Sequence, residues 1–191
     1  MPQLRLALPK TKPKPKWGGK RIGAGRPRQD GQPGKGMPHL RRPTLAARFP
    51  VHATWRMAPT VWNLRSRRSW KALAPAIYSS ERDGFRVVHF AIMGNHVHLM
   101  VEASDELRLA RGMQGLGVRI ALRLNRMMNR GGRVVGDRYH ARILRTPSEV
   151  RNVRRYLLAN AEQHFGASGP DPYTSQHPVA LPHTWLLRMN C

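Results

Sequence analysis

Residues 85–102 read FRVVHFAIMGNHVHLMVE, and this stretch decides the fold that we predict for the chain. Residues 85–93 and 96–102 are rich in the β-branched and aromatic side chains that favour strands. Gly94 and Asn95, which lie between them, are typical of a tight turn. The stretch therefore predicts a β-hairpin.

The segments on both sides of this hairpin alternate between strand-like and helix-like patterns. Two strands and three helices are expected there: a strand over 51–56, a helix over 61–80, a helix over 107–128, a strand over 139–145 and a helix that begins at Pro147. The order strand, helix, strand, strand, helix, strand, helix predicts an α+β fold of the ferredoxin-like or RRM-like kind. In that fold a four-stranded antiparallel sheet carries helices on one face.

The chain is strongly basic. Its 191 residues include 34 Lys and Arg against 10 Asp and Glu, a formal net charge of +24. A charge of this size predicts a polyanionic partner. We expect nucleic acid rather than a lipid surface, because the most basic segment is full of helix breakers and cannot form an amphipathic helix.

The expected location is a reducing, cytosolic compartment. The first residues lack the apolar run of a signal peptide, and no stretch is long and apolar enough to span a membrane, so we expect neither secretion nor membrane insertion. The single cysteine, Cys191, excludes an intramolecular disulfide and a cysteine-based zinc site.

Composition divides the chain into three predicted regions. Residues 1–44 form a basic, Pro- and Gly-rich arm, in which residues 1–42 hold 12 Lys and Arg against the lone Asp30. With so few large apolar side chains, this arm is expected to be disordered. Residues 45–165 carry the predicted fold, and residues 166–191 are expected to form an irregular tail.

His96 and His98 are the first candidate site residues. They lie two residues apart in a predicted strand, so both side chains project from one face while Val97 and Leu99 enter the core. Two neighbouring imidazoles can share a divalent metal ion. Two ligands do not complete a site, so the pair is equally compatible with two polar residues that face solvent.

The last predicted helix offers further polar groups. Tyr156 and Asn160 are four residues apart and therefore lie on one helical face. A tyrosine hydroxyl beside a metal ion is a plausible nucleophile toward phosphorus, and the amide oxygen of Asn160 can serve as a third ligand. On composition alone, Tyr156 is better explained as a half-buried helix residue. Tyr139, which enters a strand, is expected to pack rather than to react.

Four motifs in this order resemble a known family: HATWR at 52–56, FAIMGNHVHLMVE at 90–102, GDRYHARIL at 136–144 and VRRYLLAN at 153–160. Together they are similar to the single-tyrosine HUH transposases, most closely the REP-associated tyrosine transposases of bacteria. The resemblance covers the region from about residue 45 to residue 165. Many relatives read Asn-Pro-Val after the last motif, where this chain reads Asn160-Ala161-Glu162.

The resemblance implies a site and a reaction. His96 and His98 would bind a divalent metal, Mg or Mn, and Asn160 would complete the metal site. Tyr156 would attack single-stranded DNA and become linked to its 5′ phosphate, and another 3′ hydroxyl would then rejoin the strand. The expected substrate is single-stranded DNA with a nearby hairpin, and the implied location is the bacterial cytoplasm, in association with the nucleoid. Relatives occur as monomers and as dimers, so the oligomeric state stays open.

Further basic residues are candidates for DNA contacts. In the arm, KRIGAGRPR at 20–28 resembles an AT-hook, whose arginines enter an A·T-rich minor groove, and a merely electrostatic tail is an equal alternative. The candidates there are Lys20, Arg21, Arg26 and Arg28. Closer to the motifs, Arg138 and His140 are candidates for binding phosphate. Glu102 and Asp137, the nearest acids, are expected to be ordinary surface residues.

Three alternatives to the transferase stay open. A non-catalytic DNA-binding relative would keep the charge and lose the chemistry, and the end at Cys191, where relatives often continue, suggests a truncated tail. A metal-dependent nuclease would use His96 and His98 to hold an ion that activates water. An RRM-like RNA binder is suggested by topology alone. A covalent protein–DNA adduct distinguishes the transferase from the hydrolase.

Overall fold

The computed structural model describes residues 42–166 and 169–189, and within residues 161–165 only the helical backbone. The predicted arm contacts Lys20, Arg21, Arg26 and Arg28 therefore lie outside the described residues. Within the described ranges, no helix is long and apolar enough to cross a membrane.

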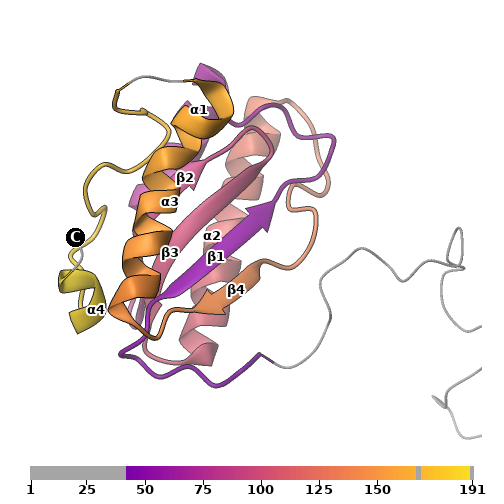
Figure 1. The fold of residues 1–191 in the computed structure, drawn as a ribbon. Coiled ribbons are helices and arrows are strands. Elements are labelled where there is room, and N and C mark those ends of the chain that lie inside the picture. Colours follow the sequence, from indigo (N-terminus) through magenta and orange to yellow (C-terminus); the bar gives the residue numbers. More distant parts are fainter. Residues whose placement is uncertain (1–41, 167–168, 190–191) are drawn as a thin grey trace, which may run out of the picture. The chain divides into compact units, whose positions relative to one another are not determined.

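Four antiparallel strands form a single sheet in the order β2-β3-β1-β4 (Figure 1). The strands are β1 (Val51–Arg56), β2 (Phe85–Ile92), β3 (His96–Ala103) and β4 (His140–Ile143). β2 and β3 are the predicted hairpin, β1 pairs with β3, and β4 pairs with β1. The predicted four-stranded antiparallel α+β fold is confirmed.

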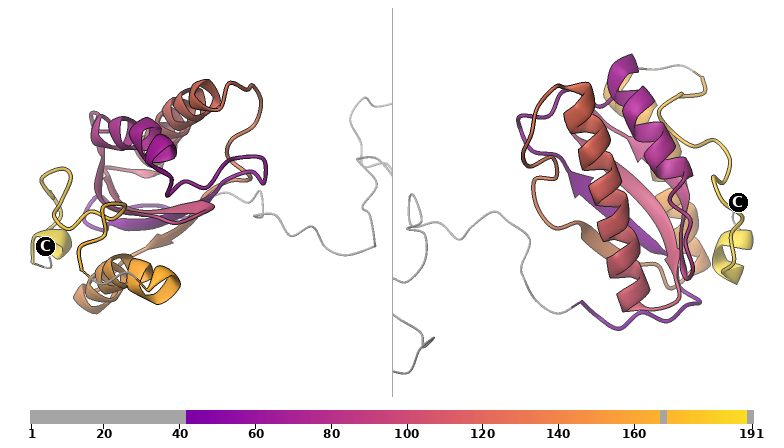
Figure 2. Two further views of the ribbon diagram at one scale, coloured as in Figure 1. Left: turned by 90° about the horizontal axis from the view of Figure 1, so that it is seen from above. Right: turned by 180° about the vertical axis from the view of Figure 1, so that it is seen from behind.

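Helices cover both faces of this sheet, as Figure 2 shows. α1 (Arg67–Tyr78) and α2 (Glu106–Met127) pack against each other on one face, which is the arrangement that the sequence predicted. α3 (Pro147–Phe165) follows the last strand and lies on the opposite face. α4 (Trp185–Arg188) is a single turn that contacts α3. The second face is therefore only partly open.

Local signals explain where the two long internal helices begin and how closely they pack. The side chain of Ser66 accepts a hydrogen bond from the backbone of Ser69 at the start of α1, and Asp105 does the same for Arg108 at the start of α2. In α2, a Cβ atom at Gly117 would collide with the ring of Trp55. Glycine there lets the helix approach the sheet.

The sheet separates two apolar cores. The larger one lies between the sheet and α1 and α2, and it includes the fully buried Val97 and Leu99, as predicted. The smaller one lies beneath α3. Its members are Val88, Ala91, Met100, Leu144, Val150, Val153, Leu157, Leu186 and Leu187. The apolar stripe of α3 therefore packs on the sheet and fixes the orientation of the helix.

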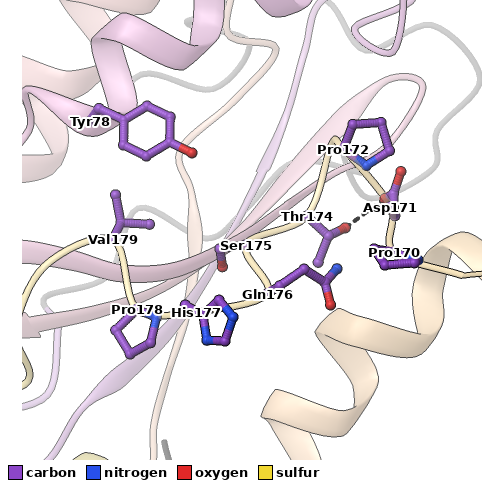
Figure 3. Close-up of a pocket in the computed structure, with 10 residues that line it drawn as sticks. All are labelled: Tyr78, Pro170, Asp171, Pro172, Thr174, Ser175, Gln176, His177, Pro178 and Val179. Atoms are coloured by element: carbon purple, nitrogen blue, oxygen red, sulfur yellow. Dashed lines mark hydrogen bonds between the residues drawn. The ribbon is translucent and has the colours of Figure 1, made fainter.

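The C-terminal segment is largely irregular, yet it packs on the domain. Its backbone follows the outer edge of β2: Ile92 N donates to the carbonyl of Tyr173 (2.9 Å), and Ser175 N donates to the carbonyl of Phe90 (3.0 Å). Asp171 forms a largely buried ion pair with Arg65 at 2.7 Å. Between this segment and Tyr78 lies a pocket of about 500 Å³ (Figure 3). The segment covers an edge that would otherwise be open to pairing.

The expectation that Glu102 is a surface acid is wrong. Its side chain is buried, with a residue exposure of 5%. The carboxylate accepts hydrogen bonds from the backbone N–H groups of His183 (2.8 Å) and Thr184 (2.7 Å), where α4 begins. The partners lie more than eighty positions away along the chain. No local sequence pattern signals such a contact.

Candidate active site

His96 and His98 lie on the sheet face that α3 covers, and their side chains meet. The two Nε2 atoms are 3.0 Å apart, and the rings are nearly perpendicular. Two neighbouring ligands of an octahedral ion, each about 2.1 Å from the metal, are separated by about 3.0 Å. The 3.0 Å separation is that of a hydrogen bond between the two rings, and it also matches the spacing of two ligands of one divalent ion. His98 is buried, with an exposure of 5%.

Tyr156 on α3 points to the same place. Its hydroxyl oxygen lies 3.3 Å from Nε2 of His98, the nitrogen that faces His96. The Tyr156 ring stands edge-on to the His98 ring, with 5.2 Å between centroids. The residue is 41% exposed, so a large substrate can reach its hydroxyl.

Asn160, one turn after Tyr156, is fully buried. Neither its Oδ1 nor its Nδ2 has a hydrogen-bond partner among the described residues. Buried amides are rarely left without partners, because each unpaired polar group costs free energy. A buried amide oxygen with no partner among the described residues is a candidate ligand for a cation.

The donor set suits a hard or borderline divalent ion. Two imidazole nitrogens and one amide oxygen are ligands that Mg²⁺, Mn²⁺ and related ions accept. Nowhere in the described part of the chain do three His, Cys, Asp or Glu residues gather into a metal-binding group. A metal here would therefore depend on Asn160, or on water and substrate, to complete its coordination.

Two residues of β1 hold His98 from behind. Thr54 Oγ1 lies 3.1 Å and His52 Nε2 lies 3.3 Å from Nδ1 of His98. Burial, assisted by the charges of His140 and Arg142, lowers the pKa of His52 to about 4, so His52 is neutral near neutral pH. A neutral His52 can accept the Nδ1–H of His98, and this leaves the lone pair of His98 on Nε2.

Sequence reasoning missed these two residues. His52 and Thr54 are 46 and 44 positions away from His98, and only the pairing of β1 with β3 brings them together. One signal was available in the sequence. His52 and Thr54 lie two residues apart in the HATWR motif, within a predicted strand, so their side chains project from the same face of the sheet.

A cavity of about 270 Å³ opens beside Tyr156. Its lining residues are His52, Arg142, Glu149, Asn152, Val153 and Tyr156. Glu149, at the start of α3, forms an ion pair with Arg142, with 2.8 Å between Oε1 and Nη2. Its Oε2 also accepts a hydrogen bond from the backbone N–H of Arg145 (2.7 Å). The cavity places one cationic side chain close to the tyrosine.

The two predicted phosphate ligands near the motifs lie on different sides of the sheet. His140 is exposed on β4 and pairs with Thr54, so it shares the face of His96 and His98. Arg138 instead lines a pocket with Trp55 and Tyr139 on the side of α2. Tyr139 is 8% exposed and belongs to the larger core, in line with the packing role predicted for it.

A family model described as "Transposase IS200 like" matches residues 53–160, which is more than half of the chain. The chain belongs to the IS200-like transposase family. The family predicted from the four motifs is thereby confirmed. The matched range includes both histidines, Tyr156 and Asn160. Membership places this transposase-like chain among enzymes that cleave DNA and transfer DNA strands.

Two solved structures resemble this member of the IS200-like family. One is a REP-associated tyrosine transposase bound to a REP hairpin, with a TM-score of 0.59 and 14% identity over 73% of this chain and 83% of that one. The other is a transposase-like protein of Deinococcus radiodurans, with a TM-score of 0.43 and 16% identity over 65% of this chain and 94% of that one. The first shows the shared fold. A comparison with curated protein sequences finds no match.

Proposed function

We propose that this chain cleaves and rejoins single-stranded DNA through a 5′-phosphotyrosine intermediate at Tyr156. His96, His98 and Asn160 would hold the divalent ion, Mg or Mn, and residues 45–165 would form the catalytic domain. The observation that carries the proposal is the convergence of three groups. Tyr156 Oη lies 3.3 Å from His98 Nε2, which lies 3.0 Å from His96 Nε2.

The protein's own residues orient the attacking oxygen. The Tyr156 ring is wedged edge-on against the rings of His98 and His52, so its hydroxyl is directed at the histidine pair. Thr54 and His52 in turn fix the His98 ring. A bound divalent ion would stabilise the negative charge that develops on the phosphate. Because the protein orients the hydroxyl before the substrate binds, less entropy is lost when the phosphate is attacked, and the activation barrier is lower.

The reaction exchanges one phosphoester bond for another. The Tyr156 hydroxyl oxygen attacks phosphorus and gives its proton to solvent, the bond from phosphorus to the 3′ oxygen breaks, and that oxygen takes up a proton. In the second half, a 3′ hydroxyl attacks the phosphotyrosine and Tyr156 leaves as a phenol. Because each half conserves one phosphoester bond, no ATP is needed.

The proposed substrate is single-stranded DNA with a nearby hairpin. Two observations support it: the net charge of +24, and the structural neighbour that binds a REP hairpin. We assign auxiliary DNA contacts to His140 and Arg138 and to the arm residues Lys20, Arg21, Arg26 and Arg28. This substrate implies a location at the bacterial nucleoid.

The decisive experiment looks for the covalent adduct. The full chain is incubated with end-labelled single-stranded DNA that contains a hairpin, in Mn²⁺ or Mg²⁺, and is run on a denaturing gel. Tyr156→Phe should reduce the adduct by at least about a thousandfold. Tyr78→Phe is the matched control, because Tyr78 is 58% exposed on α1, which lies on the face of the sheet opposite α3. That variant should form the adduct as the parent does.

Each other outcome supports a different function. Cut DNA without an adduct would indicate a metal-dependent hydrolase. DNA binding without cutting in either metal would indicate a non-catalytic relative. An adduct that persists in Tyr156→Phe would exclude Tyr156 as the nucleophile.

A further inference from the structure

A second cavity, of about 520 Å³, lies on the face of the sheet away from Tyr156. It is rich in basic and aromatic side chains. The ones that matter here are Arg42, Trp55, Gln114, Arg133, Arg138 and Tyr139. Among the described residues that line it, Asp137 is the one acid. Three guanidinium groups against one carboxylate give the cavity an excess of positive charge, which favours an anion.

Two of the arginines are held in place without neutralising their charge. The Arg42 guanidinium lies 3.7 Å from the centroid of the Tyr139 ring and donates to the Tyr139 carbonyl at 3.0 Å. Arg133 Nε donates to the carbonyl of Val135 at 2.7 Å. Neither arginine forms an ion pair with an acid in the described part of the chain. Their other N–H groups can therefore bind an anion at little ordering cost.

The floor of the cavity strengthens such binding. Trp55 and Tyr139 are both buried and meet edge to face, with 5.9 Å between centroids. Charges interact more strongly beside buried aromatic surface than in bulk water. Guanidinium groups match phosphate oxygens in geometry, so the chemistry of the cavity fits a phosphate group. Residues 1–41 are a poor occupant, because they carry the same sign of net charge as the three arginines.

The cavity and the tyrosine site lie back to back at one edge of the sheet. Thr54 and His140 face the tyrosine side, whereas their neighbours Trp55 and Tyr139 line the cavity. β4 is the edge strand here, and it pairs only with β1 among the described strands. Its exposed Arg142 also lines the cavity beside Tyr156. The β4 edge, with the exposed His140, therefore separates the two cavities.

We infer that the cavity lined by Arg42, Arg133 and Arg138 binds a phosphodiester group of the DNA strand that occupies the tyrosine site. The inference rests on the proposed function, because it takes single-stranded DNA as the substrate. It adds a second anchoring point on the opposite face of the sheet.

The test compares Arg133→Gln with Arg68→Gln, each in the Tyr156→Phe background. Arg68 is exposed on α1 and makes no hydrogen bond or ion pair with a described residue, so it controls for the loss of one charge. Fluorescence anisotropy with a mixed-sequence single-stranded oligonucleotide gives Kd over a range of KCl concentrations. Arg133→Gln should raise Kd about tenfold and reduce the salt slope by about 0.7. Arg68→Gln should change Kd by less than about twofold.

Equal effects of the two substitutions would overturn the inference. The inference would also be overturned if Arg133→Gln bound inorganic phosphate more weakly than the parent but bound the oligonucleotide with an unchanged Kd. That result would indicate a site for a free anion. Circular dichroism melting confirms that each variant is folded. Binding is measured without cleavage, so a parent that forms no adduct would refute the proposed reaction and leave this comparison valid.

Discussion

The hydroxyl oxygen of Tyr156 and Nε2 of His98 lie 3.3 Å apart although 58 positions separate the two residues in the chain. The apolar stripe of α3 produces this contact, because Val153 and Leu157 pack against Met100 and its neighbours on the sheet. Tyr156 lies between them in sequence, but its side chain is 41% exposed and contacts His98 instead of the core. Packing therefore sets the geometry of the reacting groups.

His52 should influence metal-dependent activity although it is not a proposed ligand. His52→Phe keeps an aromatic ring but removes the Nε2 acceptor, which lies 3.3 Å from His98 Nδ1. We expect the Mn²⁺ concentration for half-maximal adduct formation to rise by about tenfold or more, as for other residues that orient a metal ligand. His183→Phe, at an exposed position of the C-terminal segment, is the control. An unchanged Mn²⁺ requirement would show that Thr54 alone orients His98.

Asn160→Leu should separate stability from activity. The substitution replaces a fully buried amide, whose two polar atoms lack partners among the described residues, by an apolar side chain of similar size. Without metal, the free energy of unfolding should rise by about 1–3 kcal/mol, while adduct formation should fall. Urea denaturation in EDTA measures the first effect, with the exposed Asn152→Leu as its control. A destabilised Asn160→Leu would count against the assignment of Asn160 as a metal ligand.

His89 should make the fold sensitive to acid. It is 2% exposed, and burial, together with the charges of Arg154 and His177, lowers its pKa from 6.5 to about 4 despite a backbone hydrogen bond with Ser175. As the pH falls, His89 is therefore protonated in the unfolded chain before it is protonated in the folded protein. Stability should fall as the pH drops from about 6.5 to about 4, by up to about 3 kcal/mol from this residue.

The measurement for His89 is urea denaturation across that pH range in the parent and in His89→Gln. His52 contributes a loss of the same sign, so the difference between the two proteins isolates His89. Parallel curves for the parent and His89→Gln would show that His89 is not the titrating group.

Glu102 should anchor the C-terminal segment. Glu102→Gln weakens the charge-assisted hydrogen bonds from the backbone N–H groups of His183 and Thr184. We therefore expect the free energy of unfolding to fall by about 2 kcal/mol. Hydrogen exchange at those two amides should become faster. Arg86 lies 3.8 Å from the Glu102 carboxylate and 3.5 Å from that of the exposed Glu81, so Glu81→Gln is the control. It should cost less than about 0.5 kcal/mol. Unchanged exchange at both amides in Glu102→Gln would contradict the anchoring role.

Local patterns in the sequence determined the order and nature of the elements. The strand over 51–56 has the predicted bounds, and the helix predicted over 107–128 is found at Glu106–Met127. The first helix was predicted six residues too early, because Leu64 is buried from a loop and Ser66 caps the helix that follows. An apolar residue in a packed loop gives the same periodic signal as a helix.

The candidate site divides in the same way. The pairing of His96 with His98 and of Tyr156 with Asn160 followed from the strand and helix periods, which are properties of the chain over a few residues. Only the tertiary structure decided that Tyr156 meets the histidine pair, that Asn160 is buried without a partner among the described residues, and that His52 supports His98. It also placed Arg138 and His140 on opposite faces. Contacts across 44 to 58 positions depend on strand pairing and helix packing, which a single sequence does not encode in any local pattern.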